Sequence, residues 1–139
     1  MTELNQIPAC SKPLLSSRLF RFRAWGTKIK WMSKPFSFGQ ILNFHDQIIK
    51  SLTPDEIVMQ FTGLKDKNEV EIYEGDIVTY KRSVGNWTGQ FMTTTHKIIF
   101  TEEVNAFVMD YGSSYIKLRK HWGYEYEVIG NIFENPELL

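Results

Sequence analysis

Three things are scarce in this sequence: cysteine, net charge and long apolar runs. Cys10 is the only cysteine among 139 residues, which excludes an intrachain disulfide and a zinc site built from cysteines. Sixteen Lys and Arg balance sixteen Asp and Glu, so no whole-molecule field draws the chain toward DNA or membranes, and binding of a polyanion would need a local patch. No apolar run approaches the roughly 20 residues that span a bilayer, so we expect no membrane partner.

The sequence also limits which compartment and which domain organisation can be expected. The single cysteine favours a reducing compartment, and the first residues have neither the positive start nor the apolar block of a secretion signal. We therefore expect a cytoplasmic protein. Residues 1–18 contain Pro8 and Pro13 with no periodicity and are expected to form a flexible leader. Residues 19–139 then remain for a single domain.

The chain does have many aromatic and β-branched residues in short alternating runs. FRFRAW, residues 20–25, alternates strictly, as a half-buried strand does. Gly26 and Thr27 then predict a two-residue hairpin loop, and KIKWM at 28–32 predicts the returning strand.

A single helix is predicted between this hairpin and the later strands. Ser37 and Gln40 have the spacing of a capping box, and apolar residues recur at helical spacing from Phe38 to Leu52. The later strands are predicted where runs of Thr, Val, Ile, Tyr and Phe are separated by Gly and Asn clusters. They lie at 57–61, 70–73, 76–81, 91–100, 104–111, 114–120 and 125–133. The predicted fold is mainly β, α+β at the margin: a small SH3-like open barrel with an N-terminal hairpin and one inserted helix.

FTGLKDKNEVEIYEGDIV, residues 61–78, is the most patterned stretch of the chain. Gly63 and Gly75 are too far apart, and Lys67 is wrongly placed between them, for a phosphate-binding loop. KDKN is typical of a tight charged turn, and EGD places Gly75 at a sharp bend, where positive φ is expected. The carboxylate of Asp76 can accept backbone N–H bonds in that bend. We therefore interpret the stretch as structural.

Three segments together resemble a known family. MQFTGLKDKNEVEIYEGDIV at 59–78, FRAW at 22–25 and EVIGNIFENPELL at 127–139 are similar to motifs of the YopX family of phage and prophage proteins. The chain departs from the family pattern at Gly26, where an acidic residue usually stands, and at Glu69-Val70, in a loop that usually reads KNGKEIYEGD. The resemblance implies a small protein of mobile genetic elements and carries over no catalytic residue. The matching motifs contain four residues that we interpret as structural: Gly63, Gly75, Asp76 and Gly130.

A basic and aromatic cluster near the start raises a second hypothesis. Between Arg18 and Lys34 there are six basic residues and no acidic one. Basic side chains interleaved with aromatic rings can bind single-stranded nucleic acid, because charges track the phosphates while bases stack on the rings. The candidates are Arg21, Arg23, Lys28, Lys30, Trp25 and Trp31. In the competing interpretation, Arg21 and Arg23 decorate a sheet and pair with acidic residues near the C-terminus. These are Glu125, Glu127, Glu134 and Glu137.

The spacing of residues predicts neither a catalytic site nor a metal site. His45, His96 and His121 are dispersed, and none has a second histidine three or four residues on, as a metal site on one element would. No motif joins a nucleophile to a base or brings two carboxylates to a cleft. We expect no enzyme activity, no metal and no cofactor.

Two of the later predicted strands alternate aromatic residues. The two faces are Phe107, Met109 and Tyr111, and Trp122, Tyr124 and Tyr126. An exposed aromatic face would mark a protein interface, whereas a buried one would belong to the core.

The favoured hypothesis is a non-catalytic accessory protein of a phage or prophage, in the host cytoplasm, that acts through protein–protein contacts. We expect its partners to be itself, as a homo-oligomer, and an unknown host or phage macromolecule. Binding of single-stranded nucleic acid by the basic and aromatic hairpin is the alternative.

Overall fold

The protein forms two antiparallel sheets, and the turn at Glu74 and Gly75 joins the last strand of the first sheet to the second sheet. The computed structural model describes residues 20–37, 40, 55–84, 89–119 and 125–139. The first sheet has the order β2-β1-β4-β5, with β3 also paired to β1, and the second has the order β10-β6-β7-β8-β9. The strands are β1 (Arg21–Gly26), β2 (Trp31–Met32), β3 (Phe36–Ser37), β4 (Glu56–Lys65), β5 (Glu71–Tyr73), β6 (Asp76–Ser83), β7 (Phe91–Thr101), β8 (Ala106–Asp110), β9 (Tyr115–Lys117) and β10 (Glu125–Asn131), and the 3₁₀ turn η1 (Pro136–Leu138) follows them.

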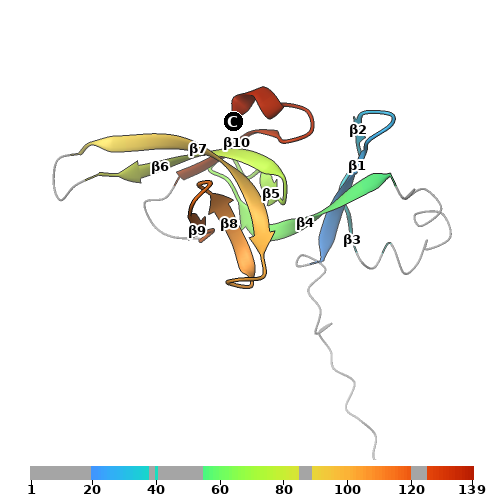
Figure 1. Ribbon diagram of the computed structural model, residues 1–139, viewed down its shortest axis with the longest axis horizontal. Helices are drawn as coiled ribbons and strands as arrows, with labels where there is room; N and C mark the ends of the chain where they lie inside the picture. The colour runs from blue at the N-terminus through green and yellow to red at the C-terminus, as the bar shows by residue number, and fades with distance from the viewer. Residues whose placement is uncertain (1–19, 38–39, 41–54, 85–88, 120–124) are drawn as a thin grey trace, which may run out of the picture.

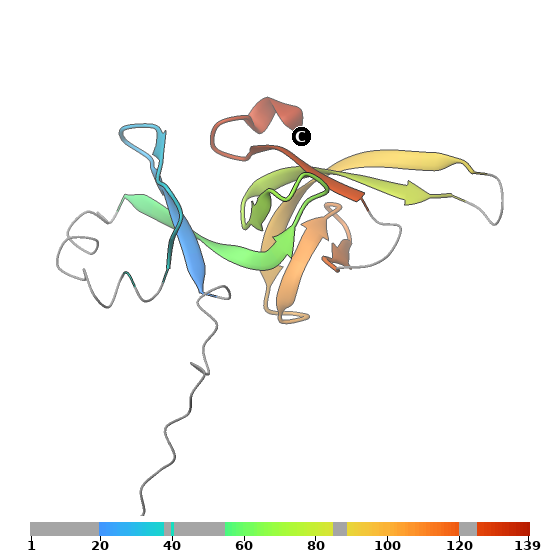
Figure 2. The same ribbon diagram turned by 180° about the vertical axis from the view of Figure 1, so that it is seen from behind.

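The prediction of a mainly β fold is confirmed, and the second sheet curls into a half-barrel (Figure 1). The predicted strands at 76–81 and 91–100 coincide closely with β6 and β7, because period-2 alternation and flanking turn residues are strong local signals. β6 and β7 extend beyond the half-barrel as a two-stranded arm, at the opposite end of the molecule from the β1–β2 hairpin (Figures 1 and 2).

The strand β4 changes partner along its length. Its first half pairs with β1, whereas Phe61 and Lys65 in its second half pair with β5. The register shifts between these two pairs, and Gly63 there has φ of 85°. A residue at positive φ within a bulge bends the strand, which is why glycine suits this position. Gly63 therefore marks the bend at which β4 passes from pairing with β1 to pairing with β5.

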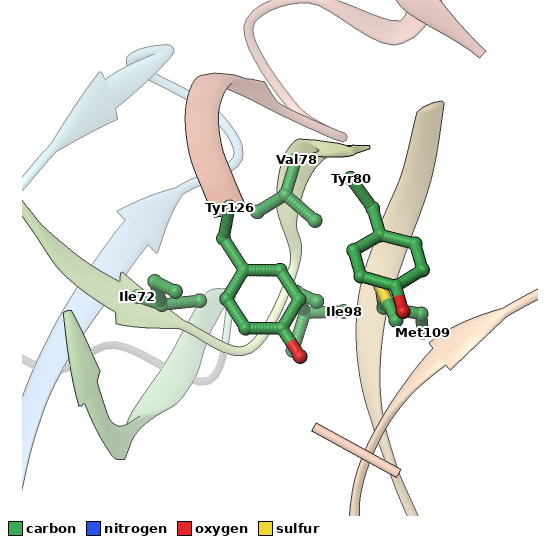
Figure 3. Packing of buried hydrophobic residues seen from close by; sticks show 6 residues of the cluster. All are labelled: Ile72, Val78, Tyr80, Ile98, Met109 and Tyr126. Atoms are coloured by element: carbon green, nitrogen blue, oxygen red, sulfur yellow. The ribbon is translucent and has the colours of Figure 1, made fainter. Parts of the chain in front are cut away.

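The core fills the inside of the half-barrel. It consists of Ile72, Val78, Tyr80, Ile98, Met109 and Tyr126, which come from β5, β6, β7, β8 and β10 and point toward one another (Figure 3). Tyr80 and Tyr126 stack with their ring centroids 5.5 Å apart. Burial of apolar surface at this one site, contributed by five strands, is the main force that holds the curled sheet closed.

The first hairpin is wider than the sequence predicted. Gly26 pairs with Trp31, so the turn contains residues 27–30, and the prediction of a two-residue loop at Gly26 and Thr27 was wrong. Gly26 continues the strand, and Lys30, with φ of 52°, takes the positive φ that the turn requires. The positive φ that was predicted for Gly26 is therefore found at Lys30, a basic residue.

The predicted capping box is present. The Ser37 backbone N–H donates to Gln40 Oε1 at 2.7 Å, and the Gln40 N–H donates to Ser37 Oγ at 3.3 Å. The helix predicted to follow lies, apart from Gln40, outside the described residues, as does the predicted leader at 1–18. Within the described ranges, no helix is long and apolar enough to cross a membrane.

Candidate binding surface

The bend at Gly75 joins three segments of the chain. Its φ is 80°, which confirms the predicted positive φ. The Gly75 N–H donates to the Ile98 carbonyl at 2.8 Å, and its own carbonyl accepts from the Ile132 N–H at 2.9 Å. The turn before β6 is therefore bonded both to β7 and to the segment after β10.

Asp76, next to this bend, is buried and has two partners. Its Oδ2 accepts a hydrogen bond from the Tyr73 N–H at 2.8 Å, as predicted from the sequence, and its Oδ1 forms an ion pair with Arg23. Only 1% of the Asp76 side chain is exposed. Burial raises the pKa of Asp76, and the Arg23 guanidinium and the Tyr73 N–H oppose that shift. Arg23 therefore compensates a buried carboxylate and is not free to bind a phosphate.

Arg21, two residues before Arg23 in β1, also pairs with a carboxylate. It forms an ion pair with Glu71 of β5, and the Tyr73 hydroxyl donates to the other Glu71 oxygen at 2.7 Å. Burial and this hydrogen bond to Glu71 raise the pKa of Tyr73. The guanidinium of Arg23 lies over the Tyr73 ring, 4.8 Å from its centroid. One face of β1 thus packs against β5 and the start of β6 through charged and aromatic contacts.

The competing interpretation of Arg21 and Arg23 was correct in kind but wrong about their partners. The arginines pair with Glu71 and Asp76 and not with the acidic residues near the C-terminus. Of those residues, Glu127 pairs with Lys67 at 2.8 Å and Glu125 lies 3.8 Å from Lys81. The prediction rested on the excess of acidic residues near the C-terminus, whereas the partners are set by β5 and the start of β6, which lie beside β1.

The six nucleic-acid candidates do not form one surface. Trp25 is 4% exposed and stacks on Phe133, with ring centroids 5.8 Å apart. Lys28 forms an ion pair with Asp55. With Arg21 and Arg23 already paired, Lys30 and Trp31 are the candidates that remain on the open side of the hairpin, and Trp31 is 56% exposed.

A different group of residues at this hairpin does share an exposed face. Gly26 pairs with Trp31 on one side and with Glu56 on the other, so Trp31, Glu56 and, two residues on, Val58 lie on one face of the sheet. Ile29 lies over the same face, since a Cβ at Gly26 would be 2.9 Å from Ile29 Cγ1. We call Ile29, Trp31 and Val58, which are 70%, 56% and 45% exposed, the hairpin patch.

The hairpin patch was only partly visible in the sequence. Trp31 was singled out, but for stacking on a base. Ile29 and Val58 lie 29 residues apart in sequence, and no local pattern joins them. Only the pairing of β1 with both β2 and β4 brings them to one face.

The predicted aromatic faces are mostly core. Met109 is completely buried, and Phe107 and Tyr111 pack against the core cluster. Tyr126 belongs to that cluster, whereas Trp122 and Tyr124 lie outside the described residues. The hypothesis of an exposed aromatic interface on this strand pair therefore does not hold for the residues that the structure describes.

A second exposed surface lies on the β6–β7 arm. Phe91 and Met92, which begin β7, are 60% and 39% exposed. The Lys81 ammonium lies 4.7 Å from the centroid of the Phe91 ring. This surface was not predicted from the sequence, although an uncharged run such as FMTTTH at 91–96 is a recognisable signal of an open strand edge.

The KDKN turn, residues 65–68, is held by a buried side chain. The Asp66 carboxylate, 5% exposed, accepts from the backbone N–H groups of Asn68, Val70 and Val128 at 2.7, 2.9 and 3.0 Å. The predicted KDKN turn is thereby bonded to β10. Gly130 is required for another reason: a Cβ there would lie 2.5 Å from Asn135 Oδ1. Both sites are structural.

The histidine and acidic side chains of the described ranges form no metal-binding cluster. Groups of three or more His, Cys, Asp or Glu side chains that could hold a metal are absent from them. His96 is buried against Tyr111, with ring centroids 3.7 Å apart, and its Nδ1 lies 3.2 Å from the Asp110 carbonyl. Burial lowers the pKa of His96. His45 and His121 lie outside the described residues.

Known proteins match the chain over most of its length. A family model described as YopX protein matches residues 21–139. A similar solved structure is the crystal structure of protein EF1440 from Enterococcus faecalis, with a TM-score of 0.53 and 26% sequence identity. The match covers 87% of this chain and 99% of that one. No curated protein matches the chain.

Proposed function

Because this chain belongs to the YopX family, we propose that it is a non-catalytic accessory protein of a phage or prophage that binds another protein through the hairpin patch. The observation that carries the proposal is the exposure of Ile29, Trp31 and Val58 on one face of the first sheet. Contiguous exposed apolar side chains on a small protein are typical of protein interfaces, and tryptophan is enriched among residues that dominate their binding energy.

The surroundings of the hairpin patch favour a specific contact. Lys28 and Asp55 form an ion pair at its edge, with 77% and 42% of their side chains exposed. Apolar residues at the centre with polar groups at the rim are the usual composition of an interface. The same tip offers few free cations, since Lys28 is paired with Asp55. Arg21 and Arg23, earlier in β1, are paired with Glu71 and Asp76. The patch therefore fits a protein surface better than a phosphate backbone.

Capture from infected host cells tests the proposal with a matched control. The wild-type chain, Ile29→Ser, Trp31→Ser and Val70→Ser serve as baits. Val70, 47% exposed, follows the KDKN turn of residues 65–68, far from the patch in the sequence, so its variant controls for loss of an exposed apolar side chain. We expect one protein to be retained by wild type and Val70→Ser and lost from both patch variants, all with unchanged melting temperatures. Equal capture by all four baits contradicts the proposal.

Binding of single-stranded nucleic acid by the hairpin tip is the second candidate. Lys28, Lys30 and Trp31 would carry it, because they are the members of the predicted set that lie near the open end of the hairpin. Each phosphate contact releases counterions, so binding measured by fluorescence anisotropy should weaken steeply with salt. Retention of a labelled single strand at low salt, abolished in Lys28→Ala/Lys30→Ala, would favour this candidate over protein binding.

A further inference from the structure

The first half of β7 presents an unpaired edge. β6 pairs with β7 from Phe91 to Lys97, but β8 pairs only with Ile98–Thr101 on the other side. Within the described ranges, no strand covers the outer side of residues 91–95. This edge belongs to the arm that extends beyond the half-barrel (Figure 1), so neighbouring elements do not shield it.

The backbone groups along this edge can be assigned. The Ile98 carbonyl accepts from the Gly75 N–H, so the backbone groups of Ile98 point toward the β6 side. In an antiparallel strand this direction alternates with each residue. Phe91, Thr93 and Thr95 therefore direct their N–H and C=O groups outward, away from β6, where no partner strand lies in the described part of the chain.

The other edges of this sheet are protected, whereas this one is not. The outer side of β10 is covered, since the Lys67 N–H donates to the Tyr126 carbonyl and the Val128 N–H to Asp66. β9 has three residues and includes Lys117. Short length and lysine both discourage pairing between molecules. In contrast, residues 91–96 read FMTTTH, with no formal charge, no proline and an unbroken register against β6.

We propose that two copies of the chain pair through this edge, so that β7 of one copy runs antiparallel to β7 of the other about a twofold axis at Thr93. The interface uses the opposite end of the molecule from the hairpin patch and goes beyond the proposed function. In this register Thr93 lies opposite Thr93 of the second copy, Phe91 lies opposite its Thr95, and Thr95 lies opposite its Phe91. All three pairs join outward-facing residues, giving about six backbone hydrogen bonds between the copies.

The side chains fit a second copy of the same strand. Pairs of threonines and pairs of an aromatic with a β-branched residue stabilise neighbouring strands. Like charges do not meet in this register, because the paired residues are neutral, and the zero net charge of the chain removes long-range repulsion between copies. Phe91, 60% exposed, gains a covering neighbour.

Analytical ultracentrifugation over a dilution series tests the interface with a matched pair of variants. Thr93→Lys places two like charges directly opposite each other across the twofold axis. Thr79→Lys adds the same charge to β6, which lies between β7 and β10 and has no free edge. We expect wild type and Thr79→Lys to dissociate from dimer to monomer at similar concentrations, and Thr93→Lys to raise the dissociation constant by about tenfold or more.

Crosslinking tests the register. In a Cys10→Ser background, Thr93→Cys should form a disulfide-linked dimer under mild oxidation, because opposite Cα atoms in a hydrogen-bonded pair are about 5.5 Å apart, within disulfide range. Thr79→Cys in the same background should not. Circular dichroism of each variant establishes that it is folded. A wild-type chain that stays monomeric at every concentration, or an oligomer that Thr93→Lys leaves intact, overturns the proposal without affecting the hairpin patch.

Discussion

Replacing Gly75 by valine should cost this protein a large part of its stability. The residue has φ of 80°, and a left-handed backbone costs an L-residue about 1–2 kcal/mol. A Cβ at Gly75 would already touch Met59 Sδ and Phe133 Cε2, each at 3.4 Å. The two methyl groups of valine would extend further into that packed site, and overpacking typically adds about 1–3 kcal/mol. We therefore expect Gly75→Val to lower the free energy of unfolding by about 2–5 kcal/mol.

Gly112 supplies a control in which only the backbone is perturbed. Its φ is also 80°, but a Cβ there would meet no atom within 4 Å. Gly112→Val should therefore cost only the strain of the left-handed backbone, about 1–2 kcal/mol. The difference between the two variants isolates the contacts with Met59 and Phe133.

Urea denaturation followed by circular dichroism measures both free energies of unfolding. Equal losses in the two variants would show that the surroundings of Gly75 adapt freely, and that the packing argument is wrong. An undiminished stability in both would refute the argument from positive φ as well. If Gly75→Val stayed stable but lost capture of a partner, the EGD motif would be a functional loop rather than a structural turn.

Two further predictions follow from buried ionisable groups. Asp76→Asn leaves the Arg23 guanidinium, 14% exposed, without its counter-charge, so it should lower the free energy of unfolding by about 3 kcal/mol. The double variant Arg23→Met/Asp76→Asn should recover part of that loss in urea denaturation, whereas additive losses would mean that the pair is not coupled. Burial lowers the pKa of His96, so the unfolded chain binds more protons at this site just below its ordinary pKa of about 6.5. Stability should therefore be full above that pH and fall as the pH drops below it, and His96→Gln should show a smaller fall in the same assay; an equal fall would assign the pH dependence to other groups.

Much of the fold could be predicted from local sequence patterns. Alternating residues and turn formers placed β6 and β7 almost correctly, because strand period and turn chemistry depend on neighbours along the chain. The bend at Gly75 and a backbone hydrogen bond to the Asp76 carboxylate were predicted for the same reason, although the donor, Tyr73, was not. The hairpin loop was misplaced by one local feature, since Lys30 rather than Gly26 takes positive φ.

The surfaces depended on contacts that no local pattern contains. Whether Arg23 is a free cation or the partner of a buried carboxylate is decided by β4, whose bend at Gly63 places β1 over Asp76. Ile29 and Val58 share a face only because β1 pairs with both β2 and β4. The edge of β7 is open at residues 91–95 because β8 pairs only with Ile98–Thr101 of β7. The sequence alone determined most of the strands, the bend at Gly75 and the family, because these depend on residues close together in the chain. Strand pairing decided which charges are buried and which apolar groups remain exposed, because it joins residues far apart in the chain.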